Sequence, residues 1–248
     1  MYERTPSPIP APLLPGALQG QFSLHDGLSA SLHCGLLAID IVGFGGRPTS
    51  LHAHLREALN TLVTTSLATV GIPPTACKQE DRGDAVFVIL PPGISPELLL
   101  GPFPDRLRRG LRRHNRLAAA GARFQVRAAV NAGFVWADER GILGGPAIEL
   151  FRLLDAAQFK AVLADQRADV GLITTERLYT ELIVDGPDLI DPDTYQPLDV
   201  STKEYRGPAR IWLPPQVPSL LSPPAQLNAG HTSATVPAAT GFGARALT

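Results

Sequence analysis

The sequence LLAIDIVGFGG, residues 36–46, is an apolar run that contains one acidic residue, Asp40, and ends in a glycine-rich corner around Phe44. A continuous apolar run that is bounded by a turn signal predicts a buried strand. A carboxylate in such a strand is costly to bury unless a positive group meets it. Asp40 is therefore expected to hold a cation or a positively charged side chain.

On both sides of this strand, apolar patterns predict strands and helices in alternation. Helices are predicted over about residues 49–69, 104–119, 146–164 and 175–183, and further strands over 84–91, 123–136 and 170–175, with a closing hairpin over 195–213. The acidic sequence EDRGD, residues 80–84, predicts a turn. Alternating strands and helices, several joined by hairpins, predict an α+β fold with an antiparallel or mixed sheet and helices on one face.

The overall composition excludes several classes of protein. The 22 Lys and Arg residues balance 23 Asp and Glu residues, so no bulk field attracts nucleic acid or an anionic membrane. The two cysteines, Cys34 and Cys77, form neither a disulfide framework nor a zinc motif. We find no apolar window long enough for a membrane helix and no secretory leader, so we expect a cytoplasmic location without membrane partners.

Proline-rich stretches divide the chain. They occur at residues 6–15 and 214–237, and the last residues are small and polar without periodicity. Chain of this composition cannot bury enough apolar surface to become ordered. We therefore expect a disordered segment over residues 1–30, a folded domain over 31–213 and a disordered tail over 214–248.

An ordered series of motifs links this pattern to a known family. The series is AIDIVGF (38–44), EDRGDAVFVIL (80–90), VRAAVNAG (126–133), GGPAIELFRLLDA (144–156) and GLITTERLY (171–179). In order and interval it resembles the class III nucleotidyl cyclase catalytic domain, especially the divergent actinobacterial type. The resemblance covers residues 34–213 and implies a ferredoxin-like α+β fold with a central, mostly antiparallel sheet and flanking helices.

The resemblance implies a metal site at the end of the first strand. Cyclases of this class convert a nucleoside triphosphate to a 3′,5′-cyclic nucleotide and pyrophosphate with two Mg²⁺ or Mn²⁺ ions, which prefer oxygen ligands. Asp40 and Asp84 match the metal-binding carboxylates, and Ile41 matches the residue that contributes its backbone carbonyl. The alternative for each aspartate is an ordinary residue at a strand end or in a turn.

The resemblance also implies residues that bind phosphate. Phe44 and Gly45 lie in the corner whose backbone N–H groups face the terminal phosphates in the family. Arg127 matches a triphosphate-binding arginine, with an exposed strand residue as the alternative. Lys203 or Arg206 matches the phosphate-binding lysine, and the spacing does not decide between them.

The predicted helix over 146–164 carries the residue that each chain is expected to contribute to the site of its partner. Arg152 matches the arginine that stabilises the transition state from the partner subunit, which implies a homodimer. Its alternative is a surface ion pair with Glu149 or Asp155. The family's ribose-orienting asparagine is replaced by Ile148, which offers no polar atom. A catalytically weak or inactive homologue that regulates through nucleotide or protein binding is therefore the alternative function.

Base selectivity rests on Glu80. This residue lies where guanylyl cyclases have glutamate, and a carboxylate accepts hydrogen bonds from guanine. The companion position, Gly141, matches neither the adenine nor the guanine pattern. The alternative for Glu80 is a residue in a solvated acidic turn.

The sequence RLRRGLRRHNR, residues 106–116, has six arginines in eleven residues. Leu107, Leu111 and His114 recur at helical spacing, so the arginines are predicted on the opposite, solvated face of a helix. Nucleic-acid binding is disfavoured because no aromatic residues interleave the run.

Overall fold

The computed structural model describes residues 31–138, 141–187, 189–203 and 205–215, and these residues belong to one compact unit that ends at Pro215. The expected disordered segments, 1–30 and nearly all of 214–248, lie outside the described residues. No helix in the described ranges has both the length and the apolarity needed to cross a bilayer.

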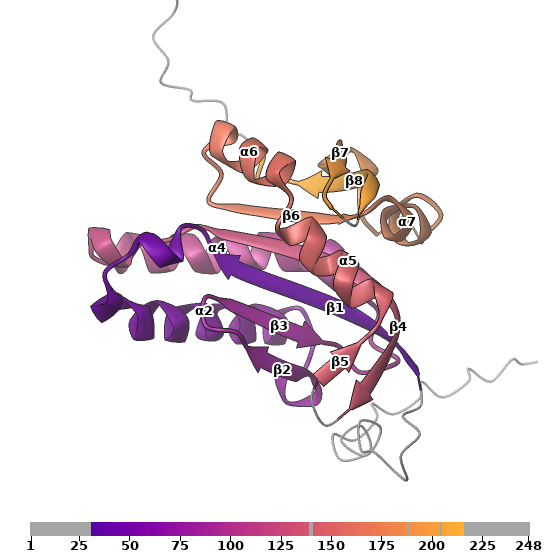
Figure 1. The fold of residues 1–248 in the computed structure, drawn as a ribbon, viewed down its shortest axis with the longest axis horizontal. Helices are drawn as coiled ribbons and strands as arrows, with labels where there is room; N and C mark the ends of the chain where they lie inside the picture. Colours follow the sequence, from indigo (N-terminus) through magenta and orange to yellow (C-terminus); the bar gives the residue numbers. More distant parts are fainter. Residues whose placement is uncertain (1–30, 139–140, 188, 204, 216–248) are drawn as a thin grey trace, which may run out of the picture. The chain divides into compact units, whose positions relative to one another are not determined.

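An eight-stranded mixed sheet forms the centre of the unit (Figure 1). Its strands are β1 (Leu32–Ile41), β2 (Lys78–Asp81), β3 (Ala85–Ile89), β4 (Val126–Asp138), β5 (Gly141–Leu143), β6 (Val170–Thr175), β7 (Tyr195–Ser201) and β8 (Arg206–Trp212). The order is β2-β3-β1-β4-β6-β8-β7, and β5 pairs with β4. Among the described strands, only the β4–β6 pair is parallel, which confirms the mostly antiparallel sheet.

The helices are α2 (Thr49–Thr69), α3 (Glu97–Leu100), α4 (Pro102–Leu117), α5 (Gly145–Leu154), α6 (Ala157–Gln166) and α7 (Glu176–Tyr179). Helix α7 continues into a π-helical turn over Thr180–Val184. Both α2 and β6 have the bounds that the sequence predicts. The long helix predicted over 146–164 is wrong in one respect: it breaks at Asp155 and Ala156, where no glycine or proline marks the end of α5.

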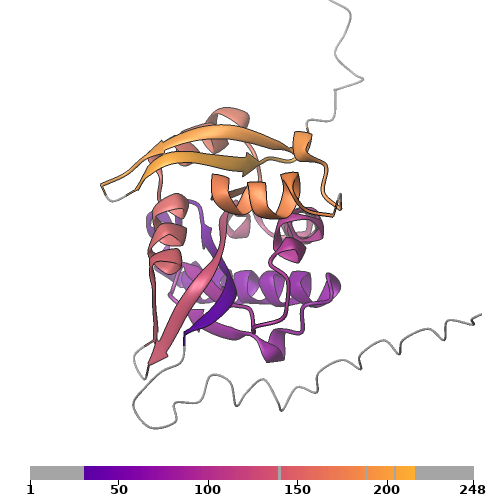
Figure 2. The ribbon, with the colours of Figure 1, turned by 90° about the vertical axis from the view of Figure 1, so that its right-hand side faces the viewer.

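Helices cover both faces of the sheet, not one as expected (Figures 1 and 2). Strand β1 explains why, because its side chains are apolar on both sides. Leu37 and Ile39 join the core beneath α2 and α4, whereas Leu36 and Ala38 join the core beneath α5 and α6. A strand that is apolar on both faces must be covered on both.

The acidic stretch before β3 also differs from the expected turn. Lys78–Asp81 pairs with β3 as the edge strand β2, so the turn itself is confined to Arg82–Asp84. Edge strands commonly carry charged side chains, which makes them hard to recognise from apolar alternation. Glu80 is therefore a strand residue.

Candidate active site

Strand pairing brings Asp40 and Asp84 to the same end of the sheet. Asp40 lies opposite Ala85 of β3, and the Ile41 N–H donates a hydrogen bond to the Asp84 carbonyl at 3.0 Å. On its other side, Asp40 lies opposite Arg127 of β4. Three residues that are far apart in the sequence thus meet where β1 ends.

The positive group that meets Asp40 is the guanidinium of Arg127. Arg127 Nε donates to Asp40 Oδ1 at 2.9 Å, and one terminal guanidinium nitrogen of Arg127 donates to Asp40 Oδ2. Both side chains are only 14% exposed. Two-pronged bonding of this kind is the strongest arginine–carboxylate geometry. Arg127 is therefore not an exposed strand residue.

The net effect of the surroundings of Asp40 is a raised pKa of its carboxyl group. Burial raises the pKa of the Asp40 carboxyl, and the hydrogen bond and charge of Arg127 oppose that rise. The nearby negative charge of Asp84 raises the Asp40 pKa further, whereas the Lys160 ammonium lowers it. Lys160, on α6, was not predicted as a site residue, because nothing in its sequence spacing relates it to Asp40.

A tight turn presents Asp84 to solvent. The Gly83 N–H donates to Asp81 Oδ1 at 2.8 Å, and Gly83 takes the left-handed φ of 90° that this turn requires. Asp81 Oδ2 also accepts a hydrogen bond from Arg56 at 2.9 Å. The exposed Asp84 follows this anchored turn.

The donor set at this end of the sheet fits a hard cation that phosphate helps to hold. Among the described residues, no three His, Cys, Asp or Glu side chains form a cluster for an all-protein metal cage. Mg²⁺ usually takes one or two carboxylates and completes its shell with phosphate and water. Each carboxylate oxygen has two acceptor positions, so Arg127 leaves acceptor capacity on Asp40.

The corner after β1 turns the chain sharply towards α2. Gly43 has a left-handed φ of 68°, which glycine adopts without strain, and Phe44–Gly46 forms a single 3-10 turn. The Phe44 ring stacks on His52 at 4.2 Å between centroids, and Gly45 is exposed. The first N–H groups of such a turn have no partner within it.

Glu80 is neutralised by two neighbours within its own hairpin. Its two carboxylate oxygens lie 3.6 Å from Lys78 Nζ and 3.0 Å from an Arg82 nitrogen. The Arg82 guanidinium also lies over the rings of Phe87 and Phe151. Gly141, the companion position for base selection, is the first residue of β5.

Helix α5 turns Glu149 towards the sheet and Ile148 outwards. Buried Asn131 of β4 donates to Glu149 Oε2 at 3.1 Å and to the Pro146 carbonyl at 2.9 Å. Ile148 is 56% exposed. Arg152 lies half-buried in the last turn of α5. The Asn131–Glu149 contact was not predicted, because it joins two elements whose separation the sequence does not reveal.

Comparison with known proteins identifies the fold. No family model and no curated protein matches the chain. The guanylyl cyclase Cya2 superposes with a TM-score of 0.53 at 13% identity, covering 75% of this chain and 92% of that one. An adenylate/guanylate cyclase/hydrolase from Silicibacter pomeroyi superposes with a TM-score of 0.54 at 14% identity, covering 76% of this chain and all of the other. The chain has the class III nucleotidyl cyclase fold.

Within this cyclase fold, Lys203 and Arg206 lie far from Asp40. Arg127 is level with Gly171 at the start of β6, whereas the end of β6 pairs with Ala209 of β8. Arg206 lies three residues beyond Ala209, at the tip of the β7–β8 hairpin. Arg206 is therefore displaced from the level of Arg127 by about seven residues along the strands. At about 3.3 Å per residue, this displacement is about 20 Å. One chain therefore does not bring the predicted phosphate-binding groups together.

Proposed function

We propose that this protein is a nucleotidyl cyclase. In the reaction, the ribose 3′-oxygen of a nucleoside triphosphate forms a bond to the α-phosphorus, and the bond from that phosphorus to the pyrophosphate oxygen breaks. The hydroxyl proton passes to solvent. The observation that carries the proposal is the pairing of β1 with β3, which brings Asp40 beside Asp84 at the end of a sheet with the cyclase fold.

Each group at this end of the sheet has a proposed role. Asp40, Asp84 and the Ile41 carbonyl would hold two Mg²⁺ or Mn²⁺ ions, which would activate the hydroxyl and neutralise phosphate charge. Arg127 holds Asp40 in place and offers positive charge to the phosphates. The corner at Phe44 and Gly45 offers them backbone N–H groups.

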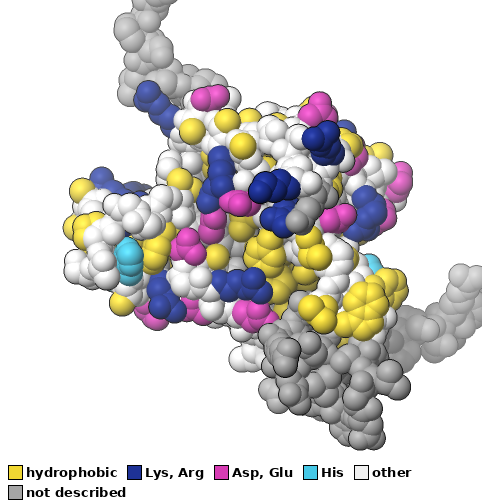
Figure 3. All heavy atoms as spheres, in the orientation of Figure 1, with side chains coloured by type: hydrophobic (Ala, Val, Ile, Leu, Met, Phe, Trp, Pro, Cys, Tyr) yellow, Lys and Arg dark blue, Asp and Glu magenta, His cyan; other side chains and the backbone are white. Residues whose placement is uncertain are grey.

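We propose that two chains share each site. Arg152 and either Lys203 or Arg206 then come from the partner, which accords with the distance of the hairpin tip from Asp40. Exposed apolar side chains on β4, β5 and α5 provide a surface for such pairing (Figure 3). These are Phe134, Trp136, Leu143 and Ile148, each between 45% and 59% exposed, with Trp136 directly opposite Leu143. Patches of this kind mark interaction sites.

A second candidate function is nucleotide binding without turnover. Ile148 supports it, because the exposed isoleucine cannot orient a ribose hydroxyl by hydrogen bonding. The occupation of both Asp40 oxygens by Arg127 also supports it, since a bound metal must share that carboxylate with a cation. This candidate predicts metal-dependent nucleotide affinity with no cyclic product.

The test is incubation of the full chain with ATP, GTP, CTP and UTP in turn, with Mg²⁺ or Mn²⁺, and detection of cyclic nucleotides by mass spectrometry. Asp84→Ala is the main variant, because this exposed residue is removable without opening the core. We expect at least about a 100-fold loss of product. Asp199→Ala, which changes an exposed aspartate on β7, is the matched control and should retain activity.

Two results would count against the proposal. Product formation that is unchanged in Asp84→Ala excludes this site as the catalyst. Metal-dependent binding without product establishes the second candidate instead. Mixing inactive Asp84→Ala with inactive Arg152→Ala tests the shared site, because random pairing restores about a quarter of the wild-type sites. No recovery would contradict sharing.

A further inference from the structure

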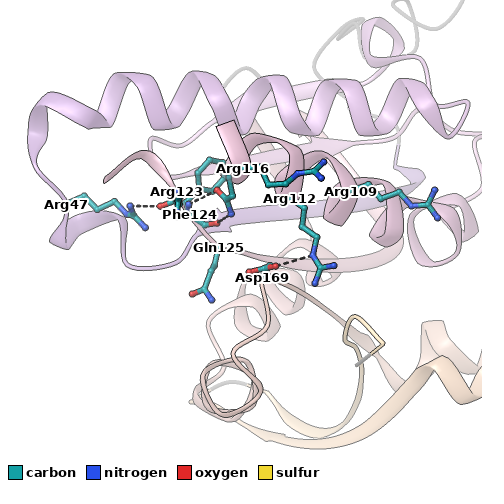
Figure 4. A pocket seen from close by; sticks show the side chains of 9 residues that line it. Arg47, Arg109, Arg112, Arg116, Arg123, Phe124, Gln125 and Asp169 are labelled. Atoms are coloured by element: carbon teal, nitrogen blue, oxygen red, sulfur yellow. Dashed lines mark hydrogen bonds and ion pairs between the residues drawn. The ribbon is translucent and has the colours of Figure 1, made fainter. Parts of the chain in front are cut away.

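A cavity of about 980 Å³ opens beside α4, and most of its lining is arginine (Figure 4). Its lining residues are Arg47, Arg109, Arg112, Asn115, Arg116, Arg123, Phe124, Gln125 and Asp169. Five arginines thus line one hollow with a single carboxylate among the described lining residues. Such a concentration of like charge is unfavourable unless an anion is present to neutralise it.

The α4 arginines of this cavity lie away from the candidate active site. Helix α4 packs with Leu107 and Leu111 on the face of the sheet that carries Leu37 and Ile39. Asp40 follows the alternate register of β1, whose side chains face α5. The α4 arginines and Asp40 therefore lie on opposite faces of the sheet, and Arg47, which follows the Phe44–Gly46 turn, links the cavity to the corner beside Asp40.

Three of the arginines belong to one stripe of α4. Arg109, Arg112 and Arg116 are spaced three and four residues apart, so they project from the same side of the helix. The expectation that the arginines of residues 106–116 form a solvated face is therefore incomplete, because half of them line a shared cavity. Seven residues of helix span about 10 Å.

Three of these arginines are held by hydrogen bonds that use one nitrogen of each guanidinium group. One terminal nitrogen of Arg47 donates to the Gly121 carbonyl at 3.1 Å and to the Arg123 carbonyl at 2.8 Å. Arg112 Nε donates to Asp169 Oδ2 at 3.3 Å, and Arg123 Nε donates to the Ala118 carbonyl at 3.2 Å. Arginine has five N–H donors, so each of these side chains keeps donors for a ligand. Binding then costs less side-chain entropy.

We infer that this cavity binds a small anion that carries several phosphate groups. Guanidinium matches phosphate through paired hydrogen bonds, and positions along about 10 Å of helix suit successive phosphates. Among the described lining residues the only aromatic one, Phe124, is 2% exposed, so these residues offer no surface on which bases stack. This favours a compact polyphosphate over a nucleic-acid strand.

The test is calorimetric titration of the full chain with sodium tripolyphosphate at low salt. EDTA is included to remove metal-dependent binding at Asp40, and the matched variants below assign the remaining binding to the cavity. We expect one tripolyphosphate per chain. Arg109→Ala/Arg116→Ala, which alters two exposed arginines of the cavity, should weaken binding by at least about tenfold. The matched control, Arg106→Ala/Arg113→Ala, removes the same charge from the same helix outside the cavity and should weaken it by about twofold or less.

Three results overturn this site. The first is no binding to the wild-type chain, and the second is equal weakening by the two double variants, which would mean diffuse attraction. The third is displacement of tripolyphosphate by a single-stranded oligonucleotide at a lower concentration than by ATP, which would make the ligand a nucleic acid. Binding of ATP and tripolyphosphate with similar affinity in EDTA supports recognition through phosphate alone. Because EDTA removes the divalent ions, failure of the cyclase assay does not alter these outcomes.

Discussion

The two faces of the sheet differ in what their side chains do. Beneath α2 and α4, strands β1 and β4 present mainly apolar residues, such as Ile39 and Ile41 on β1 and Ala128 on β4. Beneath α5 and α6, the same two strands present Asp40, Arg127 and the fully buried Asn131 among the apolar residues. One face therefore mainly stabilises the fold, and the other accommodates polar groups at a cost in stability.

The largest effect is expected from a substitution that creates a void on the apolar face. Leu107 of α4 is completely buried, so Leu107→Ala removes packed methyl groups and leaves a void. We expect the free energy of unfolding to fall by about 3 to 4 kcal/mol in urea denaturation. Cyclic nucleotide formation per folded molecule should stay unchanged. A selective loss of activity in the folded fraction would show that the apolar face also shapes the active site.

The buried ion pair provides the reciprocal test on the polar face. Asp40→Leu or Arg127→Met leaves one charge buried without its partner, and we expect each to lower the free energy of unfolding by about 2 to 3 kcal/mol. The double variant should recover most of that loss, because two apolar residues replace two charges. Urea denaturation of the four proteins forms a double-mutant cycle. A double variant that is less stable than either single variant would mean that the pair is retained for stability.

Asn131 tests the contact between α5 and the sheet. Asn131→Ala removes the donor to Glu149 and to the Pro146 carbonyl, and these partly buried acceptors lose their partner. We expect a loss of about 1 to 2 kcal/mol in the free energy of unfolding, measured by urea denaturation. No change would indicate that water replaces the amide there.

The smallest expected effect concerns the turn that presents Asp84. The Gly83 N–H and Arg56 hold the pKa of Asp81 below its usual value, so its charged form stabilises the fold above about pH 4. Asp81→Asn should cost about 0.5 kcal/mol at pH 7. The difference from wild type should disappear as the pH falls through the lowered pKa of Asp81. Thermal melts in steps from pH 7 down to about pH 2 measure it, and a difference that stays constant over the whole range would exclude a charge effect.

Local patterns predicted most of the elements, because alternation and helical periodicity depend on neighbouring residues. Helix α2 and strand β6 have the predicted bounds for this reason. Strands β2 and β5 were missed, because β2 is a charged edge strand and β5 has three residues. The break between α5 and α6 was missed because no glycine or proline marks it.

The candidate site was predictable only in part. Motif order singled out Asp40, Asp84 and Arg127, and strand register brings all three to one end of the sheet. The influence of Lys160 on Asp40 depends on how α6 packs, which no local pattern specifies.

The chain's own residues specify the order of strands and helices, the alternation of apolar side chains and the placement of a carboxylate at the end of β1. These follow from short-range stereochemistry and from the demand that apolar residues be buried. Sequence alone does not reveal that Asp40 pairs with Arg127, 87 residues away, or that Arg47 and Arg123 join three arginines of α4 around one cavity. Those contacts depend on strand register and helix packing, which long-range burial determines across the whole domain.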